Sequence, residues 1–153
     1  MVIQMVTVTI PAEVKELIAK RGLKESDVMD VVNTAAQTGK YIKKGNDGLA
    51  KKVIGGLTVY VLSDLSGHGT AVVKTAYAHK MAMGKIVNVM AETEWKTHDG
   101  KPVAQGHVEM EYMTVKRTGP ALVDPATGDG WVEEYLAVKT LAAAEGLFEK
   151  KRA

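Results

Sequence analysis

Histidine side chains are the groups in this 153-residue chain best suited to chemistry near neutral pH. An imidazole binds a metal or transfers a proton, and either use needs a second group nearby. No two histidines stand three to five residues apart, so no local metal-binding pair is encoded. A cleft containing His68, His79 or His98 would belong to an enzyme or a small-molecule or metal binder. The four histidines are His68, His79, His98 and His107.

A mixed metal site is a second possibility for these side chains. His98 and its neighbour Asp99 would supply nitrogen and oxygen ligands. His107 or Asp124 would complete the set. Ordinary surface or hydrogen-bonded histidines are the simpler interpretation, so we predict no metal and assign no catalytic or cofactor-binding residue.

Two turns in the second half have the outline of a zinc ribbon. Residues 95–100 form the first turn and residues 124–128 the second, with an extended segment between them and a helix after them. A zinc ribbon needs a pair of thiolates at each turn. The chain contains no cysteine, which excludes thiolate zinc, disulfides, iron–sulfur clusters and thiol catalysis. We therefore expect a ribbon-like part without metal.

A group of lysines around one expected hairpin is a candidate surface for RNA, as in small ribonuclease toxins. Tyr41 is the only aromatic residue there for base stacking, and the net charge of the chain is only +2. A solvated hairpin is the better interpretation, and we do not expect nucleic acid as a partner. The lysines are Lys40, Lys43, Lys44, Lys51 and Lys52.

Composition indicates a folded protein without a membrane span. Hydrophobic residues make up 46% of the chain and charged residues 25%. No apolar run reaches the roughly 18 residues that a spanning helix needs. The first residues lack the basic start and cleavage site of a secretion signal, so we expect a cytoplasmic protein.

The first half predicts an α+β domain over residues 1–83. Helical spacing of apolar residues predicts helices over 11–21 and 26–38. Extended segments over 49–54, 57–62 and 70–79 predict an antiparallel meander, with Gly55 and Gly56 at one turn. Since such a sheet buries one face, we expect the two helices to cover it.

The second half, residues 84–153, predicts the ribbon-like β part and a long helix. Residues 108–115 alternate as a strand does. Residues 131–150 begin with acidic groups at Glu133 and Glu134 and end with basic ones, as a helix dipole favours. We place a domain boundary near Gly84.

Several short segments resemble a family of small redox proteins of anaerobic bacteria. In that family an N-terminal α/β part precedes a ribbon with two cysteine pairs and a C-terminal helix ending in Leu-Glu-Asp-Lys. The resemblance covers most of residues 10–151 and implies a prokaryotic source, although this chain ends differently, at Phe148-Glu149-Lys150-Lys151. The segments are Asp27–Val32 (DVMDVV), Thr38–Lys40 (TGK), Leu49–Lys51 (LAK), Leu57–Val61 (LTVYV) and Ala76–Met81 (AYAHKM).

The departures from this family remove its chemistry. Where the resemblance implies cysteines, the chain has Lys96, Asp99, Asp124 and Thr127. These side chains do not form a structural zinc site, so neither zinc nor redox activity carries over. We therefore expect a non-catalytic accessory or scaffold subunit that acts through contacts with a protein partner or with its own copies. This hypothesis predicts an exposed apolar patch or an oligomer.

Overall fold

A hairpin closed by Gly55 and Gly56 lies at the centre of the N-terminal half. It joins β3 (Asp47–Ile54) to β4 (Leu57–Asp64). Both glycines have positive φ, +56° and +82°, which suits a two-residue hairpin turn. β5 (Thr70–His79) pairs with β4, and the short β1 (Thr7–Thr9) pairs in parallel with the beginning of β5. The computed structural model describes residues 7–67 and 69–141.

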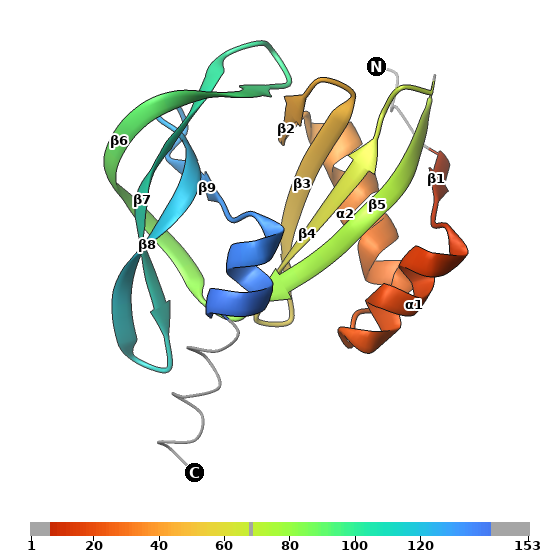
Figure 1. Ribbon diagram of the computed structural model, residues 1–153, viewed down its shortest axis with the longest axis horizontal. Helices are drawn as coiled ribbons and strands as arrows, with labels where there is room; N and C mark the ends of the chain where they lie inside the picture. The colour runs from red at the N-terminus through yellow and green to blue at the C-terminus, as the bar shows by residue number, and fades with distance from the viewer. Residues whose placement is uncertain (1–6, 68, 142–153) are drawn as a thin grey trace.

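Two helices cover one face of these strands (Figure 1). α1 spans Ala12–Lys20 and α2 spans Glu25–Thr38. The apolar stripe of α2 is buried on the sheet, and Gly39 ends the helix with a left-handed φ of +73°. The stripe consists of Val28, Val31, Val32 and Ala35.

The opposite face of the same strands is covered by the rest of the chain. The sheet continues through β6 (Ala82–Thr97), β7 (Pro102–Tyr112), β8 (Val115–Asp124) and β9 (Asp129–Trp131). These strands curve back over the first half, followed by the π-helix η1 (Leu136–Leu141) (Figure 1). A second core forms between the two halves of the sheet, and it contains Tyr60, Tyr77, Val108 and Trp131.

The short strand β2 (Tyr41–Lys44) connects the two halves. It pairs along its whole length with β3, but with β6 only at Ile42–Thr97 and Lys43–Lys96. The complete order is β1-β5-β4-β3-β2-β6-β7-β8-β9, nine strands in one mixed sheet.

The expected fold class was wrong. The chain is not a small meander with helices followed by a separate ribbon and a long helix. The described residues are mostly strand. Pairing of β2 with β6 makes the second half an extension of the first sheet, so the chain forms one sheet and no separate ribbon. The expected boundary between residues 83 and 84 stays a prediction, and it falls within β6.

The long C-terminal helix was placed wrongly at its beginning. Trp131 pairs with Leu122 as the last residue of β9 and is buried. Helical structure begins at Glu134 and continues as η1. Sheet pairing therefore overrides the helical pattern at residue 131. Residues 142–150 of the expected helix lie outside the described residues.

Ile42 should report how strongly β2 holds the two halves together. Its side chain is 1% exposed and packs in the core between the halves. We expect Ile42→Ala to lower the free energy of unfolding by about 2–4 kcal/mol, since the mutation leaves a cavity. Val53→Ala, at a side chain 69% exposed, should change it by less than about 0.5 kcal/mol. Equal effects in urea denaturation would contradict this role for β2.

Candidate functional site

The two turns singled out in the sequence meet at one groove. Residues 97–101 connect β6 to β7, and residues 124–129 connect β8 to β9. Both turns line a groove of about 370 Å³ together with Lys40 and Tyr41. The sequence therefore located two segments that the fold places side by side.

The polar side chains of these turns form hydrogen bonds within the same turn. Asp124 accepts hydrogen bonds from the Ala126 N–H and the Thr127 hydroxyl, both at 3.0 Å. Asp99 accepts one from the Thr97 hydroxyl, which lowers the pKa of its carboxyl group. These are turn-stabilising contacts of Asp and Thr.

The suggested mixed metal site is not assembled in the described part of the chain. The His98 ring packs on Tyr41, with their ring centroids 5.8 Å apart. His107 lies elsewhere, and its Nδ1 is 3.0 Å from Oδ1 of Asn88. Across residues 7–67 and 69–141, no three His, Asp or Glu side chains converge as metal ligands would.

His79 lies in the core, where its imidazole is 2% exposed. Its Nε2 is 2.9 Å from the Tyr60 hydroxyl, and the Tyr60 ring stacks on Tyr77 at 5.0 Å. Burial lowers the pKa of His79 to about 4, so the ring is neutral at pH 7. This places His79 in a structural polar cluster. His68, the other histidine suggested for a cleft, lies outside the described residues.

Three polar residues cross the sheet in register and bind the returning chain. Lys51 lies opposite Tyr60, and Tyr60 lies opposite Tyr77. The Tyr77 hydroxyl donates to the Val132 carbonyl at 2.6 Å, and the Lys51 ammonium donates to the Gly130 carbonyl. We call these three residues the polar ladder. It attaches residues 130–132 to the face of β3, β4 and β5.

Lys51 is adapted to this position by its surroundings. Its side chain is 18% exposed, and its Nζ lies 4.8 Å from the centroid of the Trp131 ring. Burial lowers the pKa of this lysine, while Asp129, 3.9 Å away, acts against that shift. Sequence analysis missed this role because the hydrogen-bond acceptor is the Gly130 backbone carbonyl, which leaves no signal in the residue pattern.

The lysine group does not form one basic surface. Lys51 points to the core between the two halves, whereas Lys52 forms a 2.8 Å ion pair with Asp30 of α2. Lys44 lies 3.8 Å from Glu94. A cleft of about 490 Å³ does open beside Lys51 and Lys52, where β3 extends beyond its pairing with β2. Both lysines already have internal partners there, which weakens the interpretation as an RNA surface.

β6 presents an apolar surface that the sequence analysis did not single out. All six residues from Val87 to Glu92 are exposed, although they belong to a strand. Val87, Val89 and Met90 are 52%, 50% and 66% exposed. An amphipathic strand normally buries every second side chain. The sequence carries no signal of this exposure, because Val, Met and Ala are equally typical of a buried strand.

Comparison of the chain with protein families, with curated proteins and with solved structures found no match in any of the three. The resemblance to small redox proteins of anaerobic bacteria therefore stays a prediction. No helix among the described residues combines the length and the apolar character needed to cross a membrane.

His79 predicts that stability falls in mild acid. The unfolded chain takes up a proton at this residue as pH drops below about 6.5, while the folded protein does so only near pH 4. The free energy of unfolding should therefore decrease by about 3 kcal/mol between these pH values. His79→Gln should show a shallower decrease in urea denaturation at pH 7 and pH 4.5. Parallel pH profiles for the two proteins would refute this assignment.

Tyr77→Phe tests the polar ladder directly. The mutation leaves the buried Val132 carbonyl without its hydroxyl donor, so we expect a loss of about 1–3 kcal/mol in the free energy of unfolding. Tyr135→Phe is the matched control, because Tyr135 is 60% exposed. A Tyr77→Phe protein as stable as the control would show that this hydrogen bond does not hold residues 130–132.

Proposed function

We propose that this protein is a non-catalytic scaffold subunit that associates through β6, and that the partner is a second copy of the chain. The observation that carries the proposal is the exposed segment of β6, in which both faces of a strand are open to solvent. We call residues 85–92 the β6 segment. Contiguous exposed apolar groups of this kind mark contact surfaces between proteins.

The pairing of β6 leaves one of its edges available. Its first edge pairs with β7, and its second edge pairs with β2 only at residues 96 and 97 among the described residues. The ladder with β7 also shifts register four times. Val87 and Met90 have no register partner on β7. Bulges disrupt regular strand addition, so docking by side chains fits this segment better than extension of the sheet.

The sequence of the β6 segment is complementary to itself. Consider two copies that cross antiparallel about a two-fold axis through the peptide bond joining Asn88 and Val89. Val87 then meets Met90 of the second copy, and Lys85 meets Glu92 of the second copy. Each contact occurs twice, as two-fold symmetry requires. Apolar groups lie at the centre and opposite charges at the rim, the usual anatomy of an interface.

No activity is needed to explain the remaining polar groups. His79 is buried in the core, and the carboxylates of the two turns accept hydrogen bonds within those turns. A scaffold role accords with these features, and the cytoplasmic location expected from the sequence stays a proposal.

Charge reversal tests both the dimer and its geometry. Lys85→Glu alone places two acidic groups opposite each other, and Glu92→Lys alone places two basic groups opposite each other. We expect each variant to shift from dimer to monomer in light scattering coupled to gel filtration. An equimolar mixture of the two should recover a heterodimer, because every rim contact is then between opposite charges.

Further variants separate the partner from the surface. Val87→Ser with Met90→Ser should also give a monomer, whereas Val53→Ser, at an exposed residue outside the β6 segment, should not. A wild-type protein that remains monomeric at millimolar concentration would refute the second copy as partner. A dimer that survives the Val87 and Met90 changes would refute the β6 segment as its interface.

A further inference from the structure

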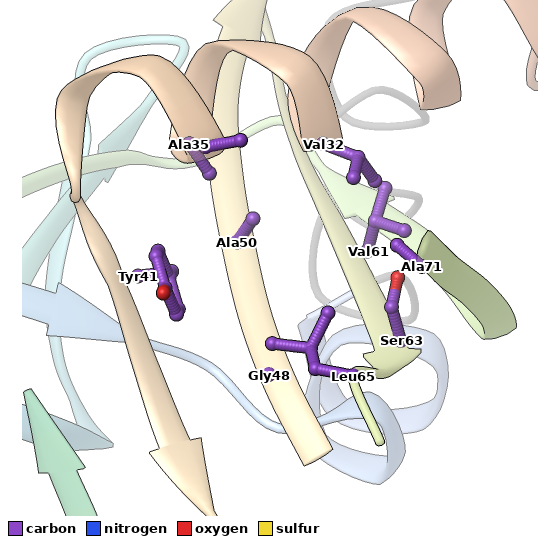
Figure 2. Close-up of a pocket in the computed structure, with 10 residues that line it drawn as sticks. Val32, Ala35, Tyr41, Gly48, Ala50, Val61, Ser63, Leu65 and Ala71 are labelled. Atoms are coloured by element: carbon purple, nitrogen blue, oxygen red, sulfur yellow. The ribbon is translucent and has the colours of Figure 1, made fainter. Parts of the chain in front are cut away.

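A cavity of about 120 Å³ lies between α2 and the sheet (Figure 2). Its roof comes from α2 and its floor from the helix-covered face of β3, β4 and β5. Alanine and glycine at five lining positions leave this space, which larger apolar side chains would fill. The lining residues are Val32, Ala35, Ala36, Tyr41, Gly48, Ala50, Val61, Ser63, Leu65 and Ala71.

Ser63 supplies an unused polar group in this apolar lining. The residue is 3% exposed, and its hydroxyl has no hydrogen-bond partner in the described structure. Figure 2 shows the Ser63 oxygen pointing from β4 toward the space beneath α2. A buried hydroxyl without a partner is destabilising, and valine would suit both the strand and the cavity better. The position therefore has the character of a ligand contact.

The ends of the cavity are shaped by Gly48, Leu65 and Tyr41. A Cβ atom at Gly48 would lie 2.5 Å from Cδ1 of Leu65, so the glycine lets the leucine close one end. Tyr41 also lines the groove between the two turns. Its half-buried ring therefore lies between the cavity and that groove.

The chemistry of the lining limits what fits. A buried water molecule needs two to four polar partners. The lining offers one unpartnered side-chain hydroxyl, that of Ser63, so the cavity does not suit water. This space of about 120 Å³ is slightly smaller than the roughly 150 Å³ of an apolar cavity that holds benzene, so it suits at most one small ring or a short branched chain. We propose that the cavity binds a small, mostly apolar molecule that carries a single hydroxyl group, with the hydroxyl on Ser63. This site is independent of the β6 segment.

Phenol and benzene are the probes, because they differ by one hydroxyl group. We expect both to shift the methyl NMR signals of Val32, Ala35 and Ala71, and phenol to bind about fivefold more tightly, as one net neutral hydrogen bond allows. Ser63→Ala keeps the space and removes the hydroxyl, so the two probes should then bind equally. Ser63→Val fills the space and should abolish binding of both.

Two controls make the outcome decisive. Thr118→Val, on an exposed position of β8, should bind both probes as the wild type does. The methyl spectrum without probe verifies that each variant is folded, and Ser63→Ala tests the hydroxyl even if Ser63→Val does not fold. Absence of shifts at the three lining residues in the wild type would overturn the proposal. So would an unchanged preference for phenol in Ser63→Ala.

Discussion

The fold depends on the attachment of residues 130–132 to the face of β3, β4 and β5. Tyr77 and Lys51 donate to two backbone carbonyls of this returning segment, and Trp131 packs under the Lys51 ammonium. These contacts pair the Tyr77 hydroxyl and the Lys51 ammonium with backbone carbonyls, so the arrangement tolerates little shift in register. α1 and α2 cover one face of these strands and form one core there. The returning segment covers the other face and completes a second core.

This curvature explains where exposed apolar groups remain. β7 and β8 contribute buried side chains to the core that contains Tyr60 and Tyr77, including Val103, Val108 and Val123. β6 lies between β2 and β7 in the sheet but pairs with β2 only at residues 96 and 97. Its middle section, residues 87–92, is exposed and covers no core. The apolar β6 segment is thus a consequence of how far the sheet curls. Nothing in its own sequence distinguishes it from a buried strand.

The site residues show the same division between pattern and context. Turns at residues 95–100 and 124–128 could be recognised from Asp, Thr and Gly, and the fold brings the observed turns, residues 97–101 and 124–129, to one groove. The burial of His79 could not be recognised, because a histidine in a strand carries no mark of which face it occupies. Ser63 is similar. A serine in a strand is ordinary in the sequence, and only the packing of α2 over the sheet buries its hydroxyl away from water.

Local signals in the sequence determined α2, the Gly39 cap and the hairpin at Gly55 and Gly56, because helical periodicity and positive φ are properties of short segments. They also determined that no thiolate site exists, since the chain has no cysteine. Only the tertiary structure decided that Trp131 ends a strand and that the two halves share one sheet. The first outcome rests on the pairing of Trp131 with Leu122 in the hairpin of β8 and β9. The second rests on pairing between residues far apart in the chain, and β2 uses only Ile42 and Lys43 to make that connection. Two paired residues are too few to produce a periodic pattern in the sequence, so the connection between the two halves could not be predicted.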